Sequence, residues 1–272
     1  MNYNYHTHTK YCHHATGEME EYVKYAIANH MEFLGFSEHS PFRFPDGYET
    51  TYHRIFIADV PDYLKEAKRL REQYQNQIKI AIGYEMEYYP LYFPKMLEMV
   101  LDFQAEYLIL GQHYLKNEYP DGFPSGVPTK NDEHLIEYTD CVIKGMQTGV
   151  FSYVAHPDFF HYAGKNEVLY QQEAKRICLA SKEYNIPLEI NLNGARTQQN
   201  YPCDQFFSVA GKIGCPVTIG MDAHNAPDVY DKENIKLAKE MIKRHGLNYI
   251  GKPNLILLQD KKEELLKQFS LT

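Results

Sequence analysis

The sequence of 272 residues predicts an α/β fold whose parallel sheet closes, or nearly closes, into a barrel. Apolar runs typical of buried strands alternate with amphipathic helical segments along the whole chain, and this alternation predicts a parallel sheet. Several apolar runs end in a residue that can bind a metal. These residues come from both ends of the chain and from its middle, and a barrel gathers such strand ends on one face more readily than an open sheet does.

The first part of the chain predicts three strands and two helices. The helix over 18–29 has acidic residues in its first turn, which the helix dipole favours. A longer helix has Tyr63, Ala67 and Leu70 on one face. Irregular segments rich in Pro, Gly or His separate the elements, at 9–16 and 40–47. In order, the predicted elements are strand Asn2–His8, helix Glu18–Asn29, strand Phe33–His39, helix Asp59–Gln75 and strand Ile78–Glu85.

The remaining sequence continues the alternation to a total of seven predicted strand–helix units and gives no sign of a linker or repeat. We therefore predict a single domain over residues 1–272. A long loop, 116–130, is predicted above the face where the strands end. The other predicted elements are helix Tyr92–Asp102, strand Tyr107–His113, helix Asp132–Gln147, strand Val150–His156, helix Leu169–Tyr184, strand Pro187–Asn191, a short helix near Asp204–Lys212, strand Pro216–Gly220, helix Lys232–His245 and a final apolar run Leu255–Leu258.

Composition excludes several classes of protein. The formal net charge of −8 argues against nucleic-acid binding, which usually requires a basic stripe. The five cysteines are odd in number and contain no C-x-x-C pair, which suits a reducing compartment. We find neither a signal-peptide pattern nor an apolar run long enough to cross a bilayer. The sequence therefore predicts a cytoplasmic protein without membrane contact, and it indicates no particular oligomeric state.

Histidines and carboxylates at the predicted strand ends indicate a metal centre. His6 and His8 are two residues apart on one strand, so their side chains point to the same side. Two neutral imidazoles aimed at one point make half of a metal site. The other candidates each end a strand or directly follow one: His39, Glu85, His113, His156, Asp222 and His224. This pattern predicts a multinuclear metal site.

In order and spacing, these motifs resemble those of the PHP (polymerase and histidinol phosphatase) superfamily. The motifs are His6-Thr-His8, residues 12–17, Ser37-Glu-His39, Gly83-Tyr-Glu85, Gly111-Gln-His113, Ala155-His-Pro157 and Met221-Asp-Ala-His224. Within the superfamily the sequence is most similar to the histidinol-phosphate phosphatases, through residues 12–17 and Glu189–Arg196. The resemblance implies a distorted (β/α)7 TIM-like barrel with three divalent metals at the C-terminal strand ends. We expect zinc, with iron or manganese as alternatives.

The resemblance also implies how the ligands divide among three metals. The first set is His6, His8, Glu85 and Asp222. The second set is His113 and His156 together with Glu85, which would bridge the first two metals. The third set is His14, His39 and His224. His13 is the alternative to His14, and the family spacing favours His14. Other histidines, including His53, lie outside the motifs and are interpreted as structural. Glu38 is expected to face away from His39 and to be structural.

The activity implied is hydrolysis of L-histidinol phosphate, a small phosphate monoester, by a hydroxide that bridges two metals. Asp222, Glu85 and His224 are the expected catalytic residues, and either Asp222 or a metal-bound water is expected to protonate the leaving alkoxide. Arg196 is predicted to bind the phosphate, with Arg43 as the alternative. Glu87 is a candidate for binding the substrate amine.

Two other functions remain open at this point. Other members of the superfamily are phosphoesterases that act on nucleotides or oligonucleotides. Some PHP domains are accessory modules of polymerases and often lose metal ligands. Here every ligand position is filled, which favours an enzyme.

Overall fold

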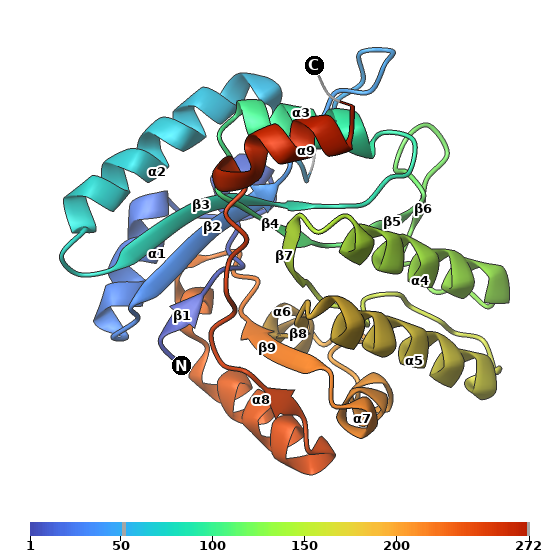
Figure 1. The fold of residues 1–272 in the computed structure, drawn as a ribbon. Coiled ribbons are helices and arrows are strands. Elements are labelled where there is room, and N and C mark those ends of the chain that lie inside the picture. The colour runs from blue at the N-terminus through green and yellow to red at the C-terminus, as the bar shows by residue number, and fades with distance from the viewer. Residues whose placement is uncertain (51–52, 271–272) are drawn as a thin grey trace.

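The computed structural model describes residues 1–50 and 53–270 and has a curled parallel sheet with helices around its outside (Figure 1). The sheet has eight strands in the order β1-β2-β3-β4-β7-β8-β9-β10, and each neighbouring pair is parallel. The strands are β1 Tyr3–Asn4, β2 Phe33–His39, β3 Lys79–Met86, β4 Tyr107–Leu110, β7 Phe151–Val154, β8 Leu188–Asn191, β9 Pro216–Gly220 and β10 Asn248–Tyr249. This arrangement confirms the predicted distorted TIM-like barrel.

Helices follow most strands and cover the outer face of the sheet (Figure 1). Several begin at a side-chain cap; for example, the Asn131 side chain accepts from the backbone N–H of Glu133. The α-helices are α1 Met19–Ala28, α2 Val60–Tyr74, α3 Phe93–Asp102, α4 Asp132–Gln147, α5 Glu167–Tyr184, α6 Leu192–Arg196, α7 Asp204–Ile213, α8 Lys232–His245 and α9 Lys262–Gln268. Short 3₁₀ helices are η1 Lys10–Cys12, η2 Ile57–Asp59, η3 Ala226–Tyr230 and η4 Gln259–Lys261.

The barrel is distorted where its two ends meet. β10 pairs only with the start of β9, at Pro216 and Val217. Beyond the other end of β9, an isolated bridge joins Thr7 to Ala223. The first and last strands therefore share one edge of β9, and the barrel closes at the end where the predicted ligands lie.

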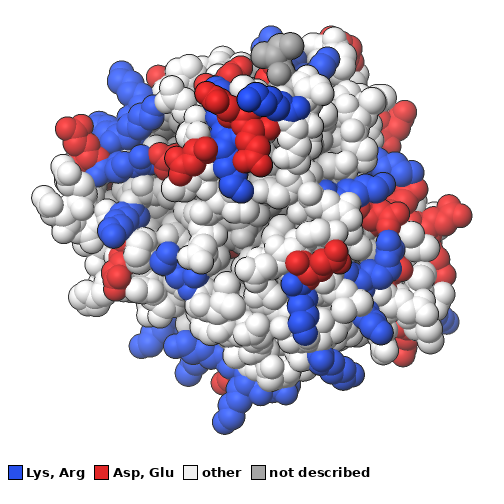
Figure 2. Space-filling view, in the orientation of Figure 1, with Lys and Arg blue, Asp and Glu red and all other residues white. Residues whose placement is uncertain are grey.

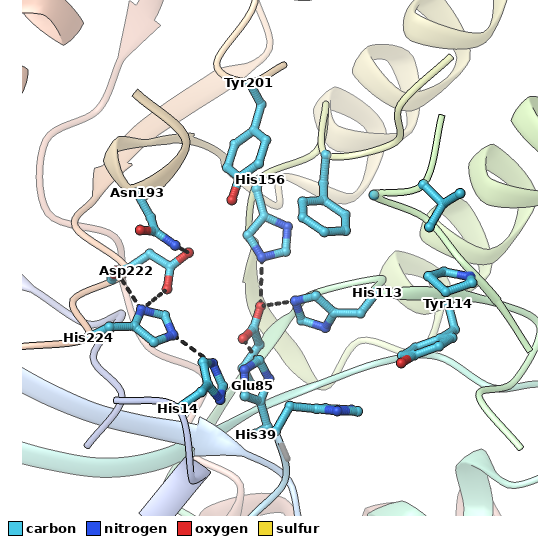
Figure 3. A pocket seen from close by; sticks show the side chains of 15 residues that line it. His14, His39, Glu85, His113, Tyr114, His156, Asn193, Tyr201, Asp222 and His224 are labelled. Carbon is cyan, nitrogen blue, oxygen red and sulfur yellow. Dashed lines mark hydrogen bonds and ion pairs between the residues drawn. The ribbon is translucent and has the colours of Figure 1, made fainter. Parts of the chain in front are cut away.

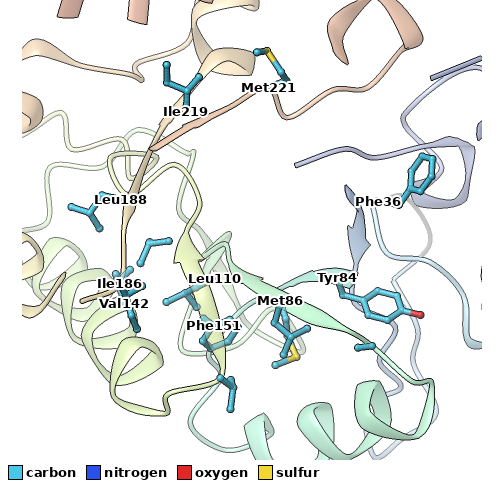
Figure 4. Close-up of a cluster of buried hydrophobic side chains, with 14 of the residues drawn as sticks. Phe36, Tyr84, Met86, Leu110, Val142, Phe151, Ile186, Leu188, Ile219 and Met221 are labelled. Carbon is cyan, nitrogen blue, oxygen red and sulfur yellow. The ribbon is translucent and has the colours of Figure 1, made fainter. Parts of the chain in front are cut away.

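Two layers of buried side chains hold the sheet in place. The larger layer lies between the sheet and the helices (Figure 4), where Leu110, Phe151 and Val142 are all buried. The smaller layer fills the barrel interior and consists of Tyr3, Tyr5, Tyr107, Ile109, Tyr153 and Ala155. It brings apolar ring surface out of water and supports the strands from inside.

Four segments differ from the sequence-based expectation. The predicted loop at 116–130 belongs to a hairpin of β5 Tyr114–Leu115 and β6 Phe123–Pro124. The eighth strand is β10, whereas the apolar run Leu255–Leu258 forms no strand. Leu255 instead packs against the inner tyrosine layer, as its segment crosses the sheet toward α9 (Figure 1). Helices α6 and α9 were not predicted.

Among the described residues, no helix combines the length and the apolar character that crossing a membrane requires.

Candidate metal centre

Four donor atoms converge where β1, β3 and β9 end. His6 Nε2 lies 3.4 Å from Glu85 Oε2 and 3.5 Å from Asp222 Oδ1. His8 Nε2 lies 3.3 Å from the same Glu85 oxygen and 3.5 Å from the same Asp222 oxygen. The two histidines point to one side, as the i, i+2 spacing on an extended chain predicts. The residues expected to form the first set therefore do lie together.

The second oxygen of Glu85 faces another pair of histidines (Figure 3). Glu85 Oε1 is 2.9 Å from His156 Nε2 and 3.4 Å from His113 Nε2. A β-carbon at Gly111 would lie 1.9 Å from this oxygen, so glycine at the end of β4 makes room for the carboxylate. One buried carboxylate thus lies between two groups of imidazoles, as expected of a bridging ligand.

The remaining three candidates form the outer part of the cluster. His14 Nε2 and His224 Nε2 are 2.9 Å apart. His39 and His224 both stack on the ring of His8, with centroids 4.3 and 4.7 Å away. His39 also places Nδ1 3.1 Å from Glu85 Oε2, so it lies between the outer and inner parts. His13, the alternative to His14, packs against Phe56 instead.

The inner donor atoms fit a divalent metal. His6 Nε2, His8 Nε2, Glu85 Oε2 and Asp222 Oδ1 are buried and have no hydrogen-bond partner among the described residues. Buried polar groups normally find a partner, so a cluster of metal-ligating atoms without hydrogen bonds indicates a cation-binding site. Burial lowers the pKa of His8 to about 3, which keeps its imidazole neutral and able to bind a metal. The mixture of imidazole and carboxylate suits zinc and other transition metals.

Buried carboxylates orient the inner histidines from behind. His6 Nδ1 lies 2.9 Å from Glu189 Oε1, and His113 Nδ1 lies 2.9 Å from Glu87 Oε1. Glu38 Oε2 is 3.9 Å from His8 Nδ1, while its other oxygen accepts from the backbone N–H of Thr9. The pairs of His6 with Glu189 and of His113 with Glu87 fix the tautomer and raise the basicity of a ligating imidazole, whereas the contact of Glu38 with His8 is too long for a hydrogen bond. Glu38 was expected to face away from His39 and to be structural; it is buried, one oxygen accepts from Thr9, and the other faces His8.

The outer histidines are supported differently. His14 Nδ1 is 2.8 Å from the carbonyl oxygen of Cys12, and His224 Nδ1 is 3.1 Å from that of Asp222. A neutral carbonyl therefore supports His14, whereas His224 Nδ1 lies near both the carbonyl and, at 3.4 Å, the carboxylate of Asp222.

Two predicted ligands have backbone conformations that are rare for their residue types. His156 and Asp222 lie two residues beyond the ends of β7 and β9, with φ of 27° and 47°. Such positions cost about 1–3 kcal/mol each and persist only where the surroundings hold them. The backbone N–H of His156 donates to Glu189, and Arg196 donates to the carbonyl of Asp222. Glu189 therefore supports two ligands at once, a role that the sequence motif around it did not reveal.

The cluster lies at the bottom of a cavity of about 390 Å³ (Figure 3). Among the described residues, no Lys or Arg lines this cavity. Beyond the predicted ligands its wall consists of His53, Tyr114, Pro124, Gly126, Val127, Phe159, Asn193 and Tyr201. A small anionic ligand at the cluster would therefore depend on bound metals for its charge balance.

Comparison with known proteins agrees with this geometry. Residues 4–193, which make up most of the chain, match the PHP domain family. The chain belongs to the PHP domain family. Curated relatives include a histidinol-phosphatase of Lactococcus lactis, 27% identical with coverage of 91% of this chain and 93% of the relative. Another is a probable histidinol-phosphatase of Deinococcus radiodurans, 26% identical with coverage of 82% and 86%.

A solved structure shares the fold. The crystal structure of the Lactococcus lactis histidinol phosphate phosphatase, in complex with zinc, L-histidinol and phosphate, superposes with a TM-score of 0.68. It is 22% identical to this chain, and the match covers 91% of this chain and 95% of the other. The barrel and its strand order are therefore those of a PHP domain.

The two arginines predicted to bind phosphate lie outside the cavity lining. Arg196 places Nε 3.2 Å from Asp228 and donates through NH2 to the carbonyl oxygens of Met221 and Asp222, at 3.0 Å each. Arg43 pairs with Glu49 and is about half exposed. In this conformation Arg196 supports the turn that carries Asp222, and the predicted phosphate contact would require its side chain to turn.

Glu87 differs from the expectation for a substrate-binding residue, because it is 1% exposed. One of its oxygens faces His113, and the other accepts from Arg54 NH2 at 2.5 Å. Arg54 is also buried and donates to Glu118 through Nε at 2.7 Å. This Glu87–Arg54–Glu118 network joins residues 53–56 to the end of β3 and to the hairpin. It had no signal in the sequence, since its members belong to no common motif.

His53 was interpreted as structural, whereas the structure places it in the cavity wall. Its Nε2 lies 3.5 Å from Glu118, and its ring stacks on Tyr114 at 5.8 Å. The residue reaches the cavity because Arg54, its neighbour in sequence, anchors this segment. Only the tertiary fold brings it there.

Proposed function

We propose that this chain is a metal-dependent histidinol-phosphatase that hydrolyses L-histidinol phosphate to L-histidinol and phosphate. The observation that carries the proposal is the group of buried, unpartnered donor atoms at the end of a PHP-type barrel. The curated relatives that cover most of the chain are named histidinol-phosphatases, and the related crystal structure holds zinc, histidinol and phosphate. The reaction belongs to histidine biosynthesis, and the proposal includes a cytoplasmic location.

We infer that three divalent metal ions bind, zinc being favoured by the related structure. His6, His8, Glu85 and Asp222 would hold the first; Glu85, His113 and His156 the second; His14, His39 and His224 the third. Metals at these positions screen the phosphate dianion and lower the pKa of bound water toward 7. His39 and His8 lie close enough to the neighbouring sets that the three sites would be in contact rather than independent.

The protein's own residues position the groups that would act on the substrate. Asp222 Oδ2 accepts from the side-chain amides of Asn191 and Asn193, at 3.2 and 3.3 Å, while Oδ1 faces His6, His8 and His224. This fixed orientation makes Asp222 the candidate for taking the proton released by the attacking water and passing it to the leaving alkoxide oxygen, with a bound water as the alternative donor. Glu85 and His224 hold the opposite sides of the space in which phosphorus would lie (Figure 3).

The cavity favours a small phosphate monoester over a polynucleotide. Its volume of about 390 Å³ suits a single small molecule. Figure 2 shows one face of the molecule, on which acidic side chains are interspersed among the basic ones. The cavity has no Lys or Arg in its lining among the described residues, whereas a polynucleotide site usually presents basic side chains. A nucleotide-directed phosphoesterase remains the alternative, since the metal chemistry would be the same.

The proposal treats residues 1–272 as one domain. β1 and β9 come from opposite ends of the chain and share an edge of the barrel, and each carries ligands of the first set. Removing either end would therefore remove donors from the cluster.

Phosphate release from a small panel tests the proposal: histidinol phosphate, mononucleotides, 3′,5′-bisphosphates and p-nitrophenyl phosphate. We expect histidinol phosphate to give by far the highest kcat/KM. Elemental analysis of protein purified without added metal should find about three transition-metal ions per chain. Preference for a nucleotide would overturn the assigned substrate, and one ion or fewer in active protein would overturn the trinuclear arrangement.

A further inference from the structure

The Tyr201 hydroxyl is an uncharged polar group in the cavity that the proposed metal ligands do not include. Tyr201 is 5% exposed and lines the cavity between α6 and α7. Figure 3 shows its hydroxyl pointing into the cavity, toward the space between His156 and Asp222. Within residues 1–50 and 53–270 this hydroxyl makes no hydrogen bond, although other buried tyrosines, such as Tyr63 and Tyr107, donate to backbone carbonyls. The hydroxyl is open to the cavity, so a ligand bound there can accept a hydrogen bond from it.

The ring of Tyr201 is held firmly in this orientation. It packs edge-on against His156 and Phe159, with centroids 5.8 and 5.3 Å away. A β-carbon at Gly194 would lie 2.5 Å from two of its ring atoms, so the glycine allows the ring to seat against α6. The loop before and after it is fastened to the β7–α5 connection through Asn200, which donates to the carbonyl of Phe159, and through Cys203, whose N–H donates to Asp158.

We propose that the Tyr201 hydroxyl is a catalytic hydrogen-bond donor to a phosphoryl oxygen of the substrate. It lies beside the ligands that would hold the metals, which is where phosphorus has to sit. An ordinary tyrosine keeps its proton at neutral pH and therefore donates to an anion. Since no described Lys or Arg lines the cavity, a donor of this kind has to come from an uncharged lining residue, and Tyr201 and Asn193 are two of these. Negative charge on the phosphoryl oxygens is where a preoriented donor acts most effectively.

The inference rests on the proposed phosphatase function and deepens it. The test substitution is Tyr201→Phe, which removes only the hydroxyl and keeps the ring that packs against His156. We expect kcat/KM to fall about 10- to 100-fold with both histidinol phosphate and p-nitrophenyl phosphate. Inhibition by inorganic phosphate should weaken in parallel. Metal content and Tm should stay at the wild-type values, because the hydroxyl has no protein partner to lose.

Tyr63→Phe is the matched control. Its hydroxyl donates to the carbonyl of Gly83 at 3.0 Å and lies outside the cavity lining, so this variant should lose stability and keep its kcat/KM. Wild-type activity in Tyr201→Phe would overturn the inference. A loss confined to histidinol phosphate would overturn it as well, because the hydroxyl would then act on the alcohol part of the substrate. If the wild-type protein hydrolyses p-nitrophenyl phosphate but not histidinol phosphate, only the substrate assignment is overturned. The role of Tyr201 is then still tested by comparing kcat/KM of the wild type and Tyr201→Phe with p-nitrophenyl phosphate.

Discussion

The two ends of the barrel interior are built from the same strands and hold opposite kinds of side chain. At one end, Tyr3, Tyr5 and Tyr107 pack together, and the Tyr107 hydroxyl donates to the carbonyl of Tyr5 at 2.8 Å. At the other end, His6 Nε2, His8 Nε2, Glu85 Oε2 and Asp222 Oδ1 face one another without hydrogen-bond partners among the described residues. Burying tyrosine stabilises the fold, whereas burying carboxylates and imidazoles without a cation costs free energy.

This difference predicts that stability and chemistry depend on different residues of the same strand. Tyr5 is followed by His6, and Tyr153 is followed three residues later by His156, so a structural residue and a predicted ligand are close in sequence. The tyrosine end would then determine stability, and the histidine end would determine chemistry. Four substitutions test how completely the two properties separate.

The largest effect on stability is expected from Arg54→Met. It would show that a residue at the histidine end also stabilises the fold. Arg54 lies at the chemical end, yet its removal leaves Glu87 and Glu118 buried without their cation. Loss of one partner from such a buried network costs about 3–5 kcal/mol. Urea unfolding of the metal-free protein measures it.

Arg71→Met provides the control for Arg54, because Arg71 forms a partly exposed pair with Glu106. This control should lose less than about 1 kcal/mol. If Arg54→Met were equally mild, the network would not stabilise the chemical end.

Asp222→Asn should lower activity while leaving the fold intact, so it separates the two properties most clearly. The change keeps the size of the side chain and removes a charge that faces His6 and His8. We expect turnover to fall about 10²- to 10³-fold, with reduced metal content and a preserved fold. Kinetics, elemental analysis and circular dichroism together check this. A turnover number within a few-fold of wild type would refute the role of Asp222.

Arg196→Ala distinguishes support of Asp222 from direct phosphate binding. Loss of its contacts to the carbonyls of Met221 and Asp222 should lower kcat/KM about tenfold. If Arg196 supports the turn, metal content falls with activity; if it turns to bind phosphate, metal content stays intact and inhibition by phosphate weakens. Arg43→Ala, assayed alongside, should behave as wild type unless the 40–47 loop binds the phosphate.

The smallest effect is expected from Tyr107→Phe, at the structural end. This change leaves the carbonyls of Tyr5 and Phe36 without the hydroxyl that now donates to both. The free energy of unfolding should fall by about 1 kcal/mol, while kcat/KM stays at the wild-type value. A loss of activity larger than the loss of stability would mean that the two ends are coupled through β1.

The sequence alone determined the alternation of strands and helices and the residues that gather at the strand ends. Both follow from local rules: apolar runs mark buried strands, and residues that end parallel strands meet on one face. His6 and His8 point together because of their spacing, and His14 rather than His13 lies against His224. Motif order added the family, since the ligands are spread along nearly the whole chain.

Tertiary structure alone decided what supports the ligands and forms the cavity wall. Glu189 reaches His6 from a strand 183 positions away, and no local pattern marks such a pair. Arg54 and Tyr201 lie in irregular segments whose paths depend on buried contacts rather than on periodicity. Glu87 was expected at the substrate because its strand face was known, but its burial depends on Arg54. Strand periodicity determines the direction of a side chain, whereas its partner is determined by the segments that pack over it.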